Sequence, residues 1–297
     1  MSTQIIYLDY EQSEALKREI DVFQQVYGSL SVWESNYLSQ CPTPEFYFRD
    51  YISRIEGLEF KRQIEKLSHC CKVLDIGVGQ GESSIYLADQ GYLVSVVEPS
   101  TELCKAIERV ANSYNFSLNI YNCTAEGIAQ INDLFDLIIF NSSLHHCDDP
   151  IKALVNCYNL LKPKGKLLLI NEPILQFFRT KEWFYTRLQT HPEEMGHYGG
   201  NEHIYRYHEY IKMLKVSGFT NIISEPNIYN SDYKIRIQQA EQRTINGKPF
   251  YNKKTLLLKR IYYYIMEQLK NGGIIGKQLL ELLKRSSIMQ TTFIATK

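Results

Sequence analysis

The sequence lacks several features of secreted and membrane-spanning proteins. Its seven cysteines are odd in number and include no C-x-x-C pair, which favours reduced thiols. The first residues show no basic stretch followed by an apolar one, as a signal peptide would. The longest apolar run, at 167–178, is interrupted by Asn171, Glu172 and Pro173, so it falls short of the length that crosses a membrane. We therefore expect a cytoplasmic protein.

An excess of one charge is also missing, since 33 Lys and Arg balance 33 Asp and Glu. A chain without a basic surplus is not typical of an enzyme that acts on nucleic acid. The charges are unevenly distributed, however, because 227–297 carries thirteen Lys and Arg against four Asp and Glu. The 297 residues are enough for one large domain with additions, and they contain no internal repeat.

What the sequence does contain is a glycine-rich turn between two regular elements. A β-type run at 72–76 leads into Gly77, Gly79 and Gly81, and a helical pattern follows at once. A strand, a glycine turn and a helix bring backbone N–H groups and a helix N-terminus close to a ligand. The third glycine comes one position earlier than in the pyrophosphate-binding pattern G-x-G-x-x-G, and Glu82 stands in that position. Because a carboxylate repels pyrophosphate, the turn favours a ligand with an amino acid or a ribose at this point.

Strand-like and helical stretches alternate from residue 72 onward. Such alternation predicts a parallel sheet with helices on both faces and with ligands at the carboxyl ends of the strands. Glu98 follows the second strand about twenty residues after the glycine turn, where an acid can accept hydrogen bonds from ribose hydroxyls. A solvated carboxylate is the alternative for Glu98, and a nicotinamide-binding fold would also use an acid here. The apolar runs expected to form strands are 72–76, 93–98, 118–123, 135–141 and 166–171.

Two further motifs make the pattern more specific. The fourth strand continues into Asn141-Ser142-Ser143-Leu144-His145-His146, and the fifth is preceded by a turn with Pro163 and Gly165. Together with Asp75-x-Gly77-x-Gly79-x-Gly81, these motifs cover about 72–172, and this part of the chain resembles the class I S-adenosylmethionine-dependent methyltransferases. Within that family it is similar to the small-molecule branch, whose members include quinone-biosynthesis enzymes.

The resemblance implies a Rossmann-like seven-stranded α/β sheet that binds S-adenosyl-L-methionine and methylates a small-molecule acceptor through its O or N atom. In this family a small residue and an acid after the third strand meet the adenine, although the usual acid before the alanine is here Thr124. The cofactor-binding residues that the resemblance implies are Asp75, Gly77, Gly79, Gly81, Glu98, Pro99, Ala125, Glu126 and Asn141.

A hydroxyl acceptor would need a base to take its proton, and a histidine with an ordinary pKa suits that task near neutrality. The candidates, in order of preference, are His146, His145 and Glu172, which all follow strands. The histidine pair is alternatively a structural feature of the entry into the next helix.

The stretch after the fifth strand, 173–206, is rich in aromatic residues and histidine, and we expect it to bind the acceptor. Flat apolar side chains with polar tips suit a ring-bearing, sugar or partly lipidic molecule. The candidate residues are Trp183, His197, Tyr198, His203 and Tyr205. His191, Glu194 and His197 have the wrong spacing for a helical zinc pair, so we expect no metal.

The chain is expected to have four parts. Aromatic residues of the N-terminal part either cover the ligand or pack that part onto the core. The parts are a helical extension at 1–70, a methyltransferase core at 71–226, a basic helical insert at 227–290 and a closing antiparallel strand at 291–297.

One helix of the basic insert is amphipathic. Leu258, Ile261, Ile265 and Leu269 make one apolar face. A basic amphipathic stretch through 253–285 can contact a membrane surface, an acidic partner or nucleic acid, whereas packing on its own domain is the commoner arrangement.

Two other functions are compatible with the sequence. An NAD-dependent oxidoreductase would use the same strand, turn and helix, but Glu82 and the histidine-bearing fourth motif disfavour it. A cofactor-binding subunit whose partner performs the chemistry is the third, because a fold does not establish activity. The sequence carries no sign of the oligomeric state.

Overall fold

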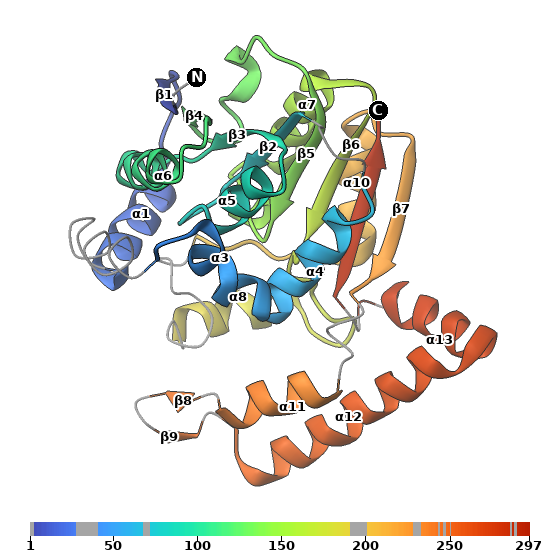
Figure 1. Cartoon of the computed structure of the whole chain (residues 1–297). Coiled ribbons are helices and arrows are strands. Elements are labelled where there is room, and N and C mark those ends of the chain that lie inside the picture. Colours follow the sequence, from blue (N-terminus) through green and yellow to red (C-terminus); the bar gives the residue numbers. More distant parts are fainter. Residues whose placement is uncertain are drawn as a thin grey trace.

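A mixed sheet of eight strands forms the centre of the computed structural model (Figure 1). The strands lie in the order β1-β4-β3-β2-β5-β6-β10-β7, and β10 is antiparallel to both of its neighbours. Their bounds are β1 Gln4–Tyr7, β2 Lys72–Ile76, β3 Leu93–Val97, β4 Asn119–Asn122, β5 Phe135–Asn141, β6 Leu161–Ile170, β7 Asn221–Pro226 and β10 Thr291–Thr296. The structure describes residues 3–27, 41–67, 72–190, 201–227, 233–242, 244–245, 248–249, 251–285, 287 and 290–297.

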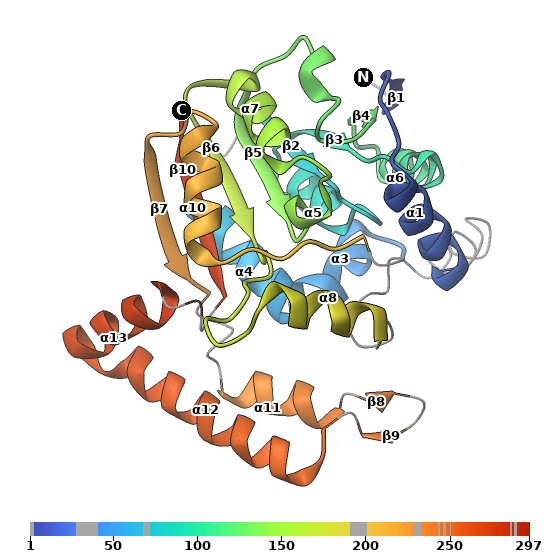
Figure 2. The same cartoon turned by 180° about the vertical axis from the view of Figure 1, so that it is seen from behind.

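Helices cover both faces of this sheet, as the alternating sequence pattern predicts. Figure 1 shows α3, α4 and α5 in front of the sheet, and Figure 2 shows α7 and α10 on the opposite face. The helices of the core and the N-terminal part are α1 Glu14–Tyr27, α3 Pro44–Ser53, α4 Ile55–Ile64, α5 Glu82–Asp89, α6 Thr101–Ser113, α7 Pro150–Leu160, α8 Lys181–Thr190 and α10 Tyr207–Val216. The predicted Rossmann-like α/β fold is confirmed.

The strand count differs from the predicted seven because the chain begins with a strand. Gln4–Tyr7 pairs in parallel with Asn119–Asn122 at the edge of the sheet. Thr3 fixes this pairing, since its Oγ1 donates to the Phe116 carbonyl (2.8 Å) and accepts from the Leu118 N–H (3.1 Å). The expectation that the first seventy residues are helical is therefore wrong for this segment. Four residues are too few to show the strand period clearly in a sequence.

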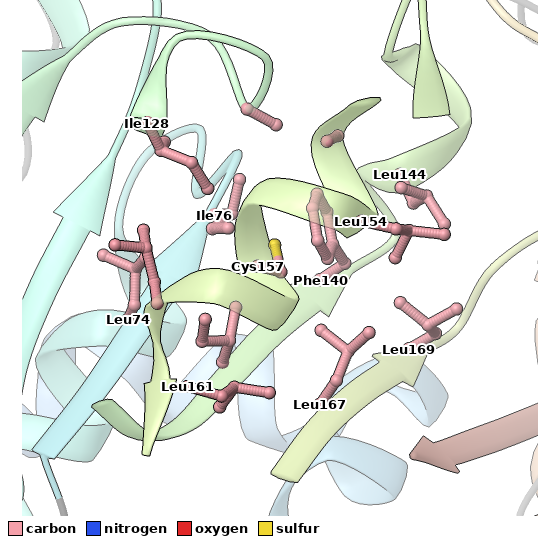
Figure 3. Packing of buried hydrophobic residues seen from close by; sticks show 14 of the residues in the cluster. Leu74, Ile76, Ile128, Phe140, Leu144, Leu154, Cys157, Leu161, Leu167 and Leu169 are labelled. Carbon is pink, nitrogen blue, oxygen red and sulfur yellow. The ribbon is translucent and has the colours of Figure 1, made fainter. Parts of the chain in front are cut away.

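The core lies on both faces of the sheet because the central strands are apolar on both sides. Along β5, Ile138 and Phe140 point to the cluster under α7 and α10, while Leu137 and Ile139 point to the cluster under α5 and α6. All four side chains are at most 2% exposed, as expected for a parallel strand between two helical layers. Figure 3 shows the first of these clusters, with Phe140 between β6 and α7.

A helical arm of α11 Tyr233–Gln242, α12 Lys253–Asn271 and α13 Gly273–Arg285, together with the short hairpin of β8 Thr244–Ile245 and β9 Lys248–Pro249, follows β7. It extends away from the sheet in both views (Figures 1 and 2) before β10 returns to the core. The insert after β6 contains α8, and the two inserts lie where the sequence predicts them. Among the described residues, none of the helices combines the length and the apolar character that crossing a membrane requires.

Candidate functional site

A pocket of about 550 Å³ lies at the carboxyl ends of β2, β3, β4 and β5. Its walls come from the segments that follow these four strands and from α1 and α3 of the N-terminal part. A volume of this size suits a small molecule, and the edge is the one where parallel α/β sheets bind ligands.

The three glycines after β2 differ in what a side chain at each position would meet. A Cβ on Gly77 would lie 2.6 Å from the Ser143 Cβ, and a Cβ on Gly81 would lie 2.9 Å from the Ile107 Cγ1. These two positions are therefore closed by the protein itself, and Gly81 does not line the pocket. Gly79 does line it, has a φ of +54°, and has no atom within 4 Å of an added Cβ. The turn thus leaves space for a ligand at Gly79.

Asp75 is buried beneath the glycine turn and lines the pocket. Its Oδ2 accepts hydrogen bonds from the hydroxyls of Ser83 (2.8 Å) and Ser84 (2.7 Å). Its Oδ1 has no hydrogen-bond partner within the described structure, although it is fully buried. Burial raises the pKa of Asp75 to about 6 against the opposing effect of the two serine hydroxyls. A buried oxygen with an unused lone pair calls for a donor, which a ligand N–H or O–H would provide.

Glu98 closes the other side of the turn. Its Oε2 accepts from the Gly79 N–H (3.1 Å) and its Oε1 from the Ser100 N–H (2.9 Å). Burial raises the pKa of Glu98 to about 7, although both backbone hydrogen bonds lower it. The adjoining Pro99 also lines the pocket, and its carbonyl oxygen accepts from the Tyr10 hydroxyl at 2.7 Å.

Ala125, Glu126 and Asn141 line the same pocket from β4 and β5. The Glu126 carboxylate accepts from the Asp149 N–H at 3.0 Å, so this acid caps the start of α7 as well as facing the pocket. The Asn141 Nδ2 donates to the Tyr51 hydroxyl at 2.6 Å. Of the nine residues expected at the cofactor, the structure therefore brings all except Gly81 to one cavity wall.

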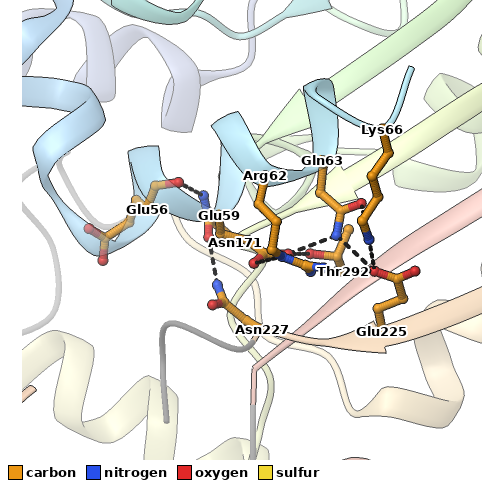
Figure 4. A network of polar contacts seen from close by, with 9 residues as sticks. All are labelled: Glu56, Glu59, Arg62, Gln63, Lys66, Asn171, Glu225, Asn227 and Thr292. Atoms are coloured by element: carbon orange, nitrogen blue, oxygen red, sulfur yellow. Dashed lines mark hydrogen bonds and ion pairs between the residues drawn. The ribbon is translucent and has the colours of Figure 1, made fainter. Parts of the chain in front are cut away.

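A chain of amide hydrogen bonds leads from the pocket to the helical arm. The Asn171 Nδ2 donates to the Asn141 Oδ1 (2.8 Å) and the Asn227 Nδ2 donates to the Asn171 Oδ1 (3.2 Å). The Asn227 N–H in turn donates to the Gln290 carbonyl (3.0 Å), where the chain re-enters the core. Figure 4 shows Asn171 and Asn227 beside α4, next to a network of charged residues.

His145 lines the pocket and is held from behind by Glu172. Its Nδ1 lies 2.8 Å from the Glu172 Oε2, and since both Glu172 oxygens also accept backbone N–H groups, we assign Nδ1 as the donor. Glu172 also accepts from the N–H groups of Ser143, Leu144 and His145. It is completely buried and does not line the pocket, so it can orient the ring rather than touch a ligand. Burial lowers the pKa of His145 despite the neighbouring carboxylate.

His146 has a different environment. Its Nδ1 lies 2.8 Å from the Asn201 carbonyl oxygen and 3.0 Å from the Glu19 Oε1 of α1. Burial lowers the pKa of His146, but Glu19, Glu202 and the Asn201 carbonyl outweigh this and raise it to about 9. His146 is therefore charged at neutral pH, unlike the ordinary imidazole that the sequence suggested.

The candidate acceptor-binding residues of the insert that the structure describes lie apart from the pocket wall. Trp183 stacks against the Arg179 guanidinium (3.9 Å) and Tyr205 packs edge-on against Tyr210 (5.5 Å). The His203 N–H donates to the His145 carbonyl at 2.9 Å, so His203 supports the histidine segment through its backbone. None of Trp183, His203 and Tyr205 lines the pocket. His197 and Tyr198, and the set of His191, Glu194 and His197, lie outside the described residues.

Sequence reasoning missed the carboxylates that the N-terminal part and the insert bring to the pocket. Glu19 comes from α1 and Glu202 from the segment before α10, and no motif marks either of them. Burial raises the pKa of Glu202 to about 7. Tyr51 and Arg54 also reach the pocket from the end of α3. For the aromatic residues of the N-terminal part, Tyr51 among them, the sequence left open whether they cover the ligand or pack on the core, and nothing in it indicated Arg54.

Residues 74–169 match the family described as a methyltransferase domain. A ubiquinone biosynthesis O-methyltransferase of Coxiella burnetii is 35% identical over 96 residues, which are 32% of this chain and 41% of the relative. A tRNA 5-carboxymethoxyuridine methyltransferase of Escherichia coli is 29% identical over 102 residues, which are 33% of this chain and 39% of the relative. The matched segment therefore spans about two fifths of the length of these curated relatives.

Similarity to solved structures extends over more of the chain. Phosphoethanolamine N-methyltransferase 2 of Haemonchus contortus, solved in complex with S-adenosyl-L-methionine, aligns with a TM-score of 0.53 and 18% identity over 94% of this chain and 56% of its own. At this identity the likeness concerns the fold alone. The segment at 74–169 therefore matches a methyltransferase domain, and the fold of the chain is similar to that of a solved methyltransferase.

Proposed function

We propose that the protein binds S-adenosyl-L-methionine in the pocket above β2 to β5 and transfers its methyl group to a small-molecule acceptor. The observation that carries this proposal is the pairing of an open position at Gly79 with a buried, unpartnered oxygen on Asp75 in one cavity. A purely structural turn would not need a buried carboxylate oxygen without a donor.

The residues present fit this cofactor. The Oδ1 of Asp75 can accept from an N–H or O–H group of the ligand, and the carboxylate oxygens of Glu98 can accept from ribose hydroxyls. Ala125, Glu126 and Asn141 would line the remainder of the cofactor site. Glu82 lines the pocket beside the turn, which agrees with a ligand that carries no pyrophosphate.

The cofactor would supply a methyl group activated by its sulfonium, so the protein has chiefly to align an acceptor with it. We assign the role of the base that removes the acceptor's proton to His145 rather than to His146. His145 holds its own proton at Nδ1 against Glu172, which leaves the lone pair at Nε2 to take a proton from a hydroxyl or an amine. The lowered pKa of His145 keeps the ring neutral near pH 7, whereas His146 is already charged there. Glu172 then acts as a positioning residue.

The charge of the pocket restricts the acceptor. Its lining includes two cations, the Arg54 guanidinium and the charged ring of His146, against the carboxyl groups of Glu19, Glu56, Asp75, Glu82, Glu98, Glu126, Asp148 and Glu202. Such a wall repels phosphate groups, which supports a ring-bearing, sugar or lipid-like acceptor and disfavours nucleic acid. Trp183, His203 and Tyr205 would act on this acceptor only if it extends beyond the pocket toward the insert.

A calorimetric comparison of two glycine variants tests the cofactor assignment. Gly79 and Gly91 both have positive φ angles (+54° and +84°) and open space around an added Cβ, but Gly91 lies in the turn before β3 and not in the pocket. Alanine therefore strains both backbones similarly. We expect Gly79→Ala to weaken S-adenosylhomocysteine binding at least tenfold and Gly91→Ala to leave it within twofold.

Two results would count against the assignment. Equal loss of affinity in both variants would mean that backbone strain, not the ligand, explains Gly79. Tight binding of NAD with no heat from S-adenosylhomocysteine would assign the pocket to the nicotinamide cofactor instead.

A further inference from the structure

The helical arm has an inner face that is packed and an outer face that is not. Inside, Met266 and Leu280 are buried against Leu269 and Leu283, which joins α12 to α13. The two helices are in close contact, since a Cβ on Gly276 would overlap the Leu269 carbonyl oxygen. The arm is therefore a defined element with its own small apolar cluster.

The outer face carries three of the four residues of the apolar face that the sequence predicts for α12, and the fourth, Leu269, belongs to the inner cluster. Leu258, Ile261 and Ile265 are 59%, 50% and 51% exposed, and they recur at the spacing of one helix face. On α13, Ile275 and Leu282 are 71% and 60% exposed and follow the same spacing. The exposed large aliphatic side chains of the arm, called here the outer stripe, are Leu257, Leu258, Ile261, Ile265, Ile274, Ile275, Leu279 and Leu282.

Positive charge accompanies this stripe. Residues 251–285 contain eight Lys and Arg against two Glu. Lys253 and Lys254 are exposed at the start of α12, and Lys277 and Arg285 are exposed on α13. On an ideal helix Lys254 lies in line with Leu258 and Ile261, so charge and apolar surface meet at one end of the stripe.

We propose that the outer stripe of α12 and α13 docks the protein on an anionic lipid surface. A continuous set of exposed leucine and isoleucine side chains along two helices marks an interaction site. Apolar side chains on one face with flanking lysines is the composition of helices that lie in the headgroup region of a bilayer. Exposed lysines then approach anionic headgroups, while the leucine and isoleucine side chains enter the boundary of the acyl chains.

Other occupants fit the surface less well. A second copy of the chain in a two-fold dimer would bring the same patch against itself, and its surplus positive charge would be repelled. The core of a protein interface is depleted of lysine, whereas six of the eight basic residues in 251–285 are lysines. An anionic membrane complements both the positive charge and the apolar side chains of the stripe.

Vesicle co-sedimentation of the full chain tests the proposal without reference to catalysis. We expect the protein to bind vesicles of phosphatidylcholine with 30% phosphatidylglycerol at least tenfold more tightly than vesicles of phosphatidylcholine alone. Binding should weaken as salt is raised from about 50 to 300 mM, because screening reduces the attraction of exposed charges.

Three variants assign the binding to the arm. Ile261→Asp should weaken binding to the anionic vesicles at least tenfold, and so should the pair Lys253→Glu with Lys254→Glu, which changes only exposed positions. Leu134→Asp is the matched control, since Leu134 is 47% exposed in the loop before β5 and Ile261 is 50% exposed. It should leave vesicle binding unchanged.

The proposal is overturned if the wild-type chain does not bind anionic vesicles, or if the Leu134 and Ile261 variants lose vesicle binding equally. A dimer in solution that Ile261→Asp dissociates would assign the stripe to a second copy and would equally overturn it. Circular dichroism of each variant identifies any loss of binding that comes from unfolding. Because no readout depends on methyl transfer, the result is independent of the proposed function.

Discussion

At the residue scale, two adjacent histidines acquire different charges because their partners differ. His145 meets Glu172, 27 residues ahead, and is buried, while His146 meets Glu19 on α1. The sequence places both rings at the end of the fourth strand but says nothing about partners so distant along the chain. The preference for His146 as the base rested on an ordinary imidazole pKa, and its pKa is instead raised to about 9.

Replacing the histidine that we assign as the base should separate catalysis from binding. We expect His145→Ala to lower kcat by roughly 10²–10⁴, because proton transfer is lost. Affinity for S-adenosylhomocysteine should stay within about twofold. The pKa of His145 is below its ordinary value, so wild-type kcat should be flat above about pH 7. A rise of kcat through pH 9 would instead identify His146.

Cofactor affinity should depend on the ionisation of Glu98. Its pKa of about 7 in the free protein means that below neutrality the carboxyl group carries a proton and accepts hydroxyl donors less well. Affinity for S-adenosylhomocysteine should therefore rise with pH and level off above about 7. In the Glu98→Gln variant, the remaining pH dependence of the affinity should follow the ionisation of Asp75, whose pKa is about 6. An affinity that is constant between pH 5.5 and 8 contradicts this assignment.

At the scale of elements, the periodicity of the sequence predicted where strands and helices lie, but it did not predict which neighbours a helix face packs against. Alternating apolar runs identified β2 to β6, and the antiparallel β10 was recovered from its position at the end of the chain. The helix of residues 253–271 was recognised as amphipathic, yet Leu258, Ile261 and Ile265 of its predicted apolar face are exposed, and only Leu269 packs, against α13. A helical period tells which residues share a face, but it does not tell what covers that face.

A buried ion-pair network joins α4 to the closing strands, and its removal should be costly. Glu59 is completely buried, accepts from the Arg62 Nε at 2.8 Å and from the Thr292 hydroxyl at 2.8 Å, and lies within the network of Figure 4. Glu59→Ala leaves the half-buried Arg62 and Thr292 with unmet donors. We expect it to lower the free energy of unfolding by about 2–4 kcal/mol in urea titrations.

The same helix offers the control. Lys61 forms an exposed pair with Glu65 at 3.8 Å, and such pairs contribute little. Lys61→Ala should change the free energy of unfolding by no more than about 0.5 kcal/mol. If the two variants are equally stable, the network is not a source of stability.

At the scale of the whole molecule, the N-terminal part reaches back over the carboxyl edge of the sheet. Leu16, Glu19 and Ile20 of α1 line the pocket opposite Asp75 and the glycine turn. The Asn201 Nδ2 donates to the Glu19 Oε2 at 2.7 Å, so α1, the histidine segment and the chain before α10 meet at one carboxylate. We propose that α1 covers the bound ligand and that the ion pair of Glu19 and His146 holds α1 in place.

This cover should loosen at alkaline pH. The pKa of His146 is raised from 6.5 to about 9, so the stabilisation by its charged ring is full below pH 6.5 and is lost as the pH rises through 9. Glu19→Ala removes the partner and should lower Tm by about 2–4 °C at pH 6.5. The difference from the wild type should shrink at pH 10 to the part that the Asn201 hydrogen bond contributes, since the wild-type ring is then neutral. Glu14→Ala, on the exposed first turn of the same helix, should show no such convergence. A Tm difference for Glu19→Ala that stays constant from pH 6.5 to 10 would mean that the contact is not an ion pair, and α1 would then be held by its apolar residues alone.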